Sequence, residues 1–225
     1  MAKKLNIVES GENVEKALSA TELFLQKNKK SITLSLGALA SIVLLFVAIQ
    51  MLYRAPRKEE ALAQLYPAEE AFNSGNFQVA LEGDGNNLGF AQIIKEYPTT
   101  SPHSIYLYAG ASHLQLGNYQ EAIDILKKYK SKEPVLQARA LAGIGDAYVA
   151  LSDYKSALSY FHKAASFSQN DYVAGYLMKA AIVHEELKEY KSALALYKKI
   201  KEKYSKTVEG ADIDKYIARA EMLLK

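Results

Sequence analysis

Few residues of this 225-residue chain have the type and spacing that catalysis or metal binding requires. The chain has no cysteine, which excludes a thiolate nucleophile, a thiolate metal site and a disulfide framework. The four histidines do not fall at metal-ligand spacings, and His184-Glu185-Glu186 departs from the zinc-protease pattern because Lys188 stands where a second histidine is needed. We predict a non-enzymatic protein with no catalytic residue, no metal site and no cofactor.

One polar segment, Asp84 to Asn87, could be interpreted as the start of a calcium-binding loop. Such a loop needs a glutamate at its distal ligand position, and Lys95 stands there instead. The adjoining Gly83-Asp84-Gly85-Asn86 sequence is also typical of a polar turn between helices. The polar turn is the favoured interpretation.

The charge of the chain is close to balanced, with 28 basic and 25 acidic residues and a net charge of +3. No arginine-rich or RNP-like segment is present, so nucleic acid is not an expected partner. Lysines gather at 198, 199, 201, 203 and 206. They fit either an acidic partner or, more commonly for interspersed charges on a helix, a solvated face.

An uncharged apolar run of 21 residues extends from Ile32 to Leu52. At about 1.5 Å per residue it reaches about 30 Å, the thickness of the hydrocarbon core of a bilayer. Basic residues flank both ends, and Tyr53 stands where an interfacial aromatic residue is typical. The run therefore predicts a single transmembrane helix over residues 32–53. The alternatives are a cleaved signal peptide, whose nearest small-x-small triplet at residues 61–63 lies beyond a charged stretch, and a buried core helix.

The lengths of the flanking segments indicate the orientation of this helix. The tail of residues 1–31 is short and holds six lysines, whereas residues 54–225 can translocate as a domain. We therefore expect a cytoplasmic tail and an external domain over residues 54–225. Apolar residues at helical spacing from Val14 to Leu25 predict a short amphipathic helix in the tail, which either docks on a neighbouring membrane protein or is solvated.

The rest of the chain contains an internal repeat. An aromatic-x-x-Ala-aliphatic pattern occurs four times, with its alanines 42, 35 and 36 residues apart at Ala80, Ala122, Ala157 and Ala193. A turn dipeptide precedes each copy, and an apolar-periodic stretch of helix length precedes each turn. The pattern predicts successive helical hairpins.

These residues resemble tetratricopeptide repeats, whose unit is a pair of antiparallel helices. Small residues stand where the paired helices must approach closely, with Gly110, Gly145 and Ala181 in the first helices. The resemblance implies an all-α solenoid of about four helix pairs, closed by a capping helix over residues 210–224. It also places His113 and His184 in core positions of the repeat. In the first repeat, Pro67 is expected to interrupt the first helix, and the Gly83–Asn86 segment to break the second.

The concave surface of such a solenoid is lined by the first helices, and partner binding there is its usual activity. The corresponding positions are mostly apolar with scattered acids and lack the Lys, Asn and Arg of carboxylate-clamping repeats. We therefore expect the surface to bind an apolar helix or an extended segment of an unfolded chain, unless these residues are core contacts between repeats. They are Leu65, Glu69, Phe72, Leu107, Ala111, Leu114, Ala142, Asp146, Val149, Met178, Ile182 and Glu185.

The order of tail, single span and repeats resembles the YfgM-like family of ancillary subunits of the bacterial SecYEG translocon. This resemblance implies an inner-membrane protein whose repeats face the periplasm. Its implied partners are SecYEG and a membrane-anchored chaperone of the PpiD type, beside which the repeats would receive emerging polypeptides. Two alternatives remain, a scaffold of another envelope assembly or secretion complex and a cytoplasmic enzyme regulator of the opposite topology.

Overall fold

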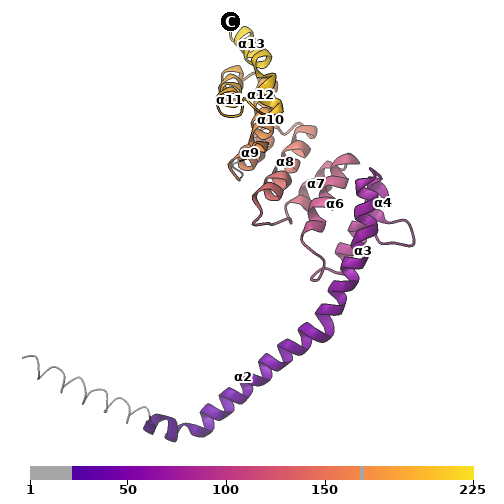
Figure 1. Ribbon diagram of the computed structural model, residues 1–225, viewed down its shortest axis with the longest axis vertical. Coiled ribbons are helices and arrows are strands. Elements are labelled where there is room, and N and C mark those ends of the chain that lie inside the picture. The colour runs from indigo at the N-terminus through magenta and orange to yellow at the C-terminus, as the bar shows by residue number, and fades with distance from the viewer. Residues whose placement is uncertain (1–21, 168–169) are drawn as a thin grey trace, which may run out of the picture. The chain divides into compact units, whose positions relative to one another are not determined.

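The computed structural model describes residues 22–167 and 170–225, and the regular structure within these ranges is helical (Figure 1). The chain divides into two units, one ending at Pro56 and the other covering Arg57 to Lys225. The prediction of an all-α fold is confirmed. The helices are α2 (Lys29–Ile49), η1 (Gln50–Arg54), α3 (Ala55–Asn73), α4 (Phe77–Glu82), α5 (Phe90–Glu96), α6 (Ser104–Gln115), α7 (Tyr119–Leu126), α8 (Pro134–Ala150), α9 (Tyr154–Phe167), α10 (Tyr172–Glu186), α11 (Tyr190–Lys203), α12 (Val208–Ala211) and α13 (Ile213–Leu223).

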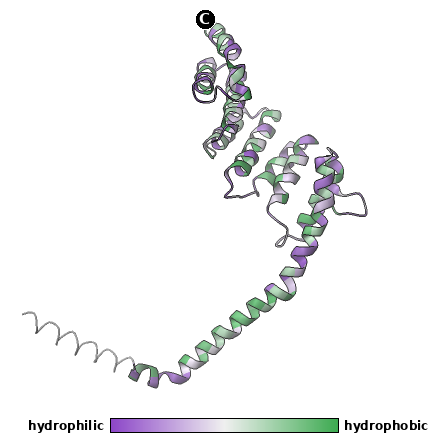
Figure 2. Cartoon of the chain, in the orientation of Figure 1, coloured by the Kyte–Doolittle hydropathy of each residue, from purple (hydrophilic) through white to green (hydrophobic). Residues whose placement is uncertain are grey.

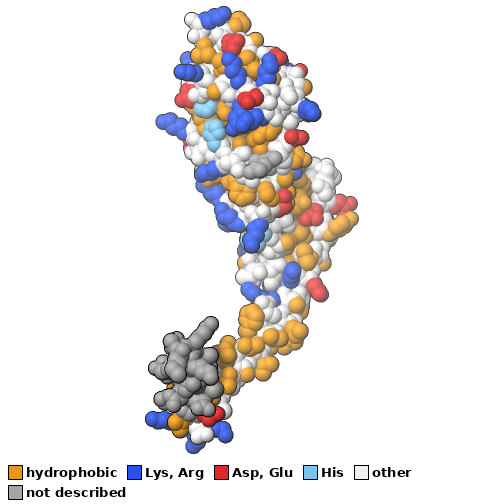
Figure 3. All heavy atoms as spheres, turned by 60° about the vertical axis from the view of Figure 1, so that its left-hand side comes forward, with side chains coloured by type: hydrophobic (Ala, Val, Ile, Leu, Met, Phe, Trp, Pro, Cys, Tyr) orange, Lys and Arg blue, Asp and Glu red, His pale blue; other side chains and the backbone are white. Residues whose placement is uncertain are grey.

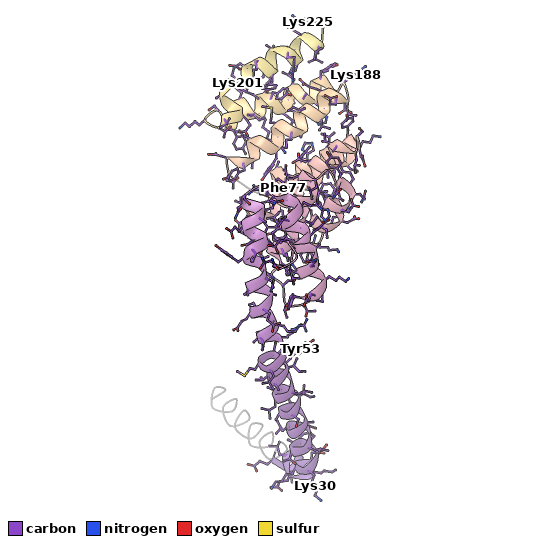
Figure 4. The ribbon with its side chains drawn as sticks, turned by 90° about the vertical axis from the view of Figure 1, so that its right-hand side faces the viewer. Lys30, Tyr53, Phe77, Lys188, Lys201 and Lys225 are labelled. Carbon is purple, nitrogen blue, oxygen red and sulfur yellow. The ribbon has the colours of Figure 1, made fainter. Side chains whose placement is uncertain are left out.

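The predicted membrane segment forms α2 and the π-helical turn η1. No residue of either element is buried, and the helix is long and apolar enough to cross a bilayer. Figure 2 shows the nearly continuous hydrophobic colouring of α2, and Figure 4 labels Lys30 and Tyr53 near the ends of the segment. Exposed side chains of this kind exclude the alternative of a core helix buried within the described part of the chain. Most of the predicted amphipathic helix of the tail lies outside the described residues.

The expectation that Pro67 interrupts a helix is wrong, because α3 continues through it to Asn73. Proline has no N–H, so the helix loses one backbone hydrogen bond at this point. Leu65 and Ala68, on either side, are both buried in the core of the first repeat. Their burial offsets the lost hydrogen bond and keeps this stretch helical.

The four turns that join first to second helices share one backbone conformation. Gly75, Gly117, Ser152 and Lys188 all have positive φ, between 59° and 81°. The N–H of the next residue then bonds to a carbonyl five residues back in each case, for example from Asn118 N to His113 O at 2.9 Å. This is the Schellman ending, which satisfies carbonyls that the helix end leaves without partners. Each predicted turn dipeptide therefore ends the first helix of a pair and allows the second helix to begin directly after it.

The paired helices pack α6 on α7, α8 on α9 and α10 on α11. The alanines of the repeated pattern are fully buried in all four copies, and the large residues opposite the small ones, Leu126, Phe161 and Tyr197, are buried as well. A Cβ atom added at Gly145 would stand 2.6 Å from Cε1 of Phe161. The small residues are therefore required for the close approach of the helices, as predicted.

The first repeat is irregular where the sequence indicated. Its second helix stops as α4 at Glu82, and a new helix, α5, begins at Phe90. Gly83 has φ of +85°, and Gly89 packs against the backbone of Leu81 so closely that no Cβ would fit. At the other end, the predicted capping helix forms as α12 and α13, and Ile213 and Ala220 bury it against the last core.

Candidate partner-binding surface

The predicted surface residues lie on the first helix of each pair, α3, α6, α8 and α10. Two of them offer little surface, since Leu65 is 6% exposed and Ala142 is 5% exposed. Both belong to the cores of their repeats. Ile182 on α10 is the most open apolar member, with 40% of its surface exposed. The remaining members are partly buried: Glu69, Phe72, Leu107, Ala111, Leu114, Asp146, Val149, Met178 and Glu185.

Several of these partly buried side chains pack against the cores. The ring of Phe72 lies 5.2 Å from that of Tyr108 and 5.4 Å from that of Phe77, in edge-to-face arrangements. Leu114, Val149 and Met178 also contact buried core residues. The alternative interpretation, core contacts between repeats, therefore applies to this subset. An exposed side chain such as Ile182 is a better probe of binding than Phe72 or Leu114.

Two predicted acids are paired with cations of helices further along the chain. The ammonium of Lys179 on α10 lies 2.6 and 2.7 Å from the two carboxylate oxygens of Asp146 on α8. Arg219 on α13 contacts both carboxylate oxygens of Glu185 on α10 through two nitrogens. Bidentate guanidinium–carboxylate pairs have well-defined geometry. Asp146 and Glu185, two of the three predicted acids of this surface, thus have a cationic partner within the chain.

The pair of Glu185 and Arg219 lies beside buried aromatic residues. The guanidinium of Arg219 stands 5.1 Å from the ring centre of Tyr216, whose ring is 5.5 Å from that of the fully buried Tyr197. Burial is the main cause that raises the pKa of Tyr197, to about 12. This phenol therefore remains neutral at physiological pH. The contacts among Arg219, Tyr216 and Tyr197 pack α13 against the last repeat.

The histidines in core positions have different surroundings. The Nδ1 atom of His184 lies 2.6 Å from a carboxylate oxygen of Glu189 at the start of the second helix. His113 is partly buried, and its Nδ1 has no hydrogen-bond partner among the described residues. Burial lowers the pKa of His113 and favours the neutral ring. No group of three or more His, Asp or Glu side chains in the described ranges has a geometry suited to a metal ion.

The segment from Asp84 to Asn87 forms a polar turn. One carboxylate oxygen of Asp84 accepts hydrogen bonds from the backbone N–H groups of Asn86 and Asn87, at 2.9 and 2.7 Å. The other accepts one from the Asn87 side-chain amide at 2.9 Å. These hydrogen bonds lower the pKa of Asp84. The carboxylate thus organises its own turn, in keeping with the favoured interpretation.

Comparisons with known proteins agree with this architecture. Residues 176–207 match the family described as "Tetratricopeptide repeat", and residues 85–164 match "Anaphase-promoting complex, cyclosome, subunit 3". No curated protein sequence matches the chain. Two crystal structures of MamA are similar, one with 17% identity, a TM-score of 0.56 and coverage of 74% of this chain and 88% of MamA. The other has 19% identity, a TM-score of 0.51 and coverage of 69% and 93%.

A third similar structure has nearly identical TPR-like repeats and is described as a kinesin light chain of Podosopora anserina. It has 14% identity, a TM-score of 0.56 and coverage of 74% of this chain and 87% of that one. At these identities the likeness establishes the fold alone. The fold of this chain is that of the tetratricopeptide repeats, a class of helical scaffold for protein–protein interaction.

Proposed function

We propose that this chain is a non-enzymatic, membrane-anchored adaptor that binds proteins through the first helices of its repeats. Residues 1–31 form the cytoplasmic tail, residues 32–53 the membrane span and residues 54–225 the external binding domain. The proposal rests chiefly on one observation, the uncharged and unburied helix α2 in the same chain as a repeat fold that serves protein binding.

The cellular setting that we propose is the bacterial inner membrane, with the repeats in the periplasm. The support is the six lysines within residues 1–31 and the resemblance to the YfgM-like family. In this setting the adaptor works beside SecYEG and a membrane-anchored chaperone of the PpiD type, and its apolar surface receives emerging polypeptides or the chaperone. The second candidate is a scaffold of another envelope assembly or secretion complex, which would use the same anchor and surface.

In vivo crosslinking from Ile182 tests the proposed partners. A photo-crosslinking amino acid replaces Ile182, which is exposed on α10, and a matched probe replaces Lys155, which is exposed on the second helix α9. We expect translocon subunits or a periplasmic chaperone to be crosslinked from position 182 and not from 155. Crosslinks to components of a different envelope complex would favour the second candidate, and the absence of crosslinks from 182 would contradict both.

A substitution at the same position tests the use of the surface. Ile182→Asp places a charge on an exposed apolar site without opening a core, so the repeats remain folded. The proposal predicts a loss of partner capture from solubilised membranes with an unchanged helical circular dichroism spectrum. Retention of the partners by this variant would show that binding occurs elsewhere.

A further inference from the structure

A pair of basic residues recurs at the same position in three successive repeats. The pairs are Lys127-Lys128, His162-Lys163 and Lys198-Lys199, which are 35 and 36 residues apart, like Ala122, Ala157 and Ala193 of the repeated pattern. All six side chains are exposed. Equal spacing relative to the repeat places the pairs on equivalent sites of stacked units, just after α7 and within α9 and α11.

The first member of each pair contacts the next element along the solenoid. Lys127 donates a hydrogen bond to the Tyr148 hydroxyl on α8 at 3.3 Å, and the ring of His162 lies 6.1 Å from that of His184 on α10. Lys198 forms an ion pair with Glu221 on α13 at 3.0 Å. The first members therefore join neighbouring helices. We use the name basic row for the second members of the three pairs, which are Lys128, Lys163 and Lys199.

The charges of two second helices, α9 and α11, differ from those of the first helices α6 and α8. Helix α9 has two lysines and no acid, and α11 has five lysines and one glutamate. Helix α6 has no charged Lys, Arg, Asp or Glu residue, and α8 has one arginine and one aspartate. Figure 3 shows Lys and Arg side chains together with histidines on the repeat unit. Positive charge is thus concentrated on α9 and α11, whereas α7 carries two acids and no lysine and is followed directly by Lys127 and Lys128.

The basic residues of these second helices are lysines and a histidine, with no arginine in α7, α9 or α11. Arginine suits defined bidentate pairing with carboxylates, whereas lysine is a hydrated point charge on a flexible stem. The ammonium of Lys163 stands 4.7 Å from the ring centre of Tyr160, and no described carboxylate forms an ion pair with Lys128, Lys163 or Lys199. Lysines without a paired carboxylate suit a broad, diffuse anionic surface better than an acidic peptide. Such attraction acts over roughly 8 Å at physiological salt, which requires the surface to be near.

On this basis we infer that the basic row of Lys128, Lys163 and Lys199 docks the repeat domain onto the anionic headgroups of the membrane that anchors it. The inference rests on the proposed membrane anchor, because tethering keeps the domain at a high effective concentration near the lipid. Lysines near an anionic leaflet are attracted to it without a specific binding pocket. Docking through the second helices would leave the first helices open to protein partners.

The test uses the full chain in nanodiscs of phosphatidylcholine alone or with phosphatidylglycerol. Because the chain has no cysteine, Ser159→Cys introduces a single dye site, exposed on α9 one turn before Lys163. Gln115→Cys, exposed at the end of the uncharged helix α6, is the matched control. The readout is quenching of the dye by a quencher attached to the lipid headgroups.

We expect quenching at position 159 to be about threefold stronger with phosphatidylglycerol, to fall at high salt, and to exceed quenching at position 115. Replacing Lys128, Lys163 and Lys199 together by Glu should remove the lipid dependence, and replacing them by Gln should weaken it. Both variants keep the first members of the pairs, so circular dichroism should be unchanged.

Equal quenching in both lipids, or quenching that survives the Glu variant, would overturn the docking inference while leaving the anchor intact. Lipid-independent quenching together with loss of a copurifying protein from the Glu variant would also overturn it, in favour of an acidic protein partner. Failure of the chain to enter either nanodisc would contradict the proposed anchor itself, and the docking inference with it.

Discussion

The four interhelical turns each need a residue with positive φ, and glycine adopts this conformation at a lower energetic cost than the other residues found there. Lys188 has φ of +60°, in the left-handed region where Gly117 stands in an equivalent turn. A side chain costs about 1 kcal/mol in this conformation. Lys188→Gly should therefore raise the free energy of unfolding by about 0.5–1 kcal/mol, measured by denaturation in detergent. The reverse change, Gly117→Lys, should lower it, and a stabilising effect of that control would contradict the explanation.

His113 should make stability depend on pH. Its pKa in the folded chain is lowered by burial, with a smaller opposing effect from Glu121, so the unfolded chain binds the proton more readily. The contribution of the neutral ring is complete above about pH 6.5 and is lost as the pH falls from there towards the lower folded pKa. Urea denaturation from pH 8 to pH 5 should show a smaller loss of stability for His113→Gln than for the unaltered chain. Parallel curves for the two would be incompatible with this role.

The charged contacts of the surface residues could not be predicted from the sequence. Asp146 and Glu185 were identified as surface acids, but Lys179 and Arg219 were not identified as their partners. Each partner lies about one repeat further along, and the pairing depends on how adjacent helices are rotated. By contrast, the close approach of the paired helices at Gly110, Gly145 and Ala181 was predicted from the resemblance to the repeats.

Whole helices depend on close approach within each pair. In Gly145→Ala the added Cβ would stand 2.6 Å from Cε1 of Phe161 between α8 and α9, at an overpacking cost of about 1–3 kcal/mol. Alanine's better helix propensity, about 1 kcal/mol, offsets only part of this cost. The melting temperature should fall. In the control Gly175→Ala the added Cβ would stand 3.0 Å from a carboxylate oxygen of Glu209, which is the end of a flexible side chain. Equal destabilisation of both variants would therefore refute the packing argument.

The sequence predicted most helices, because the repeated aromatic-x-x-Ala pattern and the turn dipeptides mark both the register and the ends. It predicted the break after α4 from the Gly83–Asn86 segment. It failed at Pro67, where local preference indicated an end and tertiary burial of Leu65 and Ala68 maintained the helix. It also could not separate surface from core on α3, since Phe72 packs within an aromatic cluster that other helices complete.

At the scale of the whole molecule, the chain combines an apolar helix with a repeat fold in which lysines are concentrated on α9 and α11. We assign the first helices to protein partners and the basic row of Lys128, Lys163 and Lys199 to anionic lipid. Lipid docking requires α2 to span the membrane, and the proposed partners also require the repeats to lie outside the cytoplasm. The sequence supports this topology through the charge-free run and the lysine-bearing tail.

Protease accessibility in spheroplasts tests this topology most directly. The full chain carries an epitope tag at each end, and protease is added before and after the membrane is permeabilised. We predict that the C-terminal tag is lost at once from intact spheroplasts, while the N-terminal tag remains on a short, membrane-embedded fragment. A C-terminal tag that is protected until permeabilisation, with a cytoplasmic protein as control for intactness, would contradict the account.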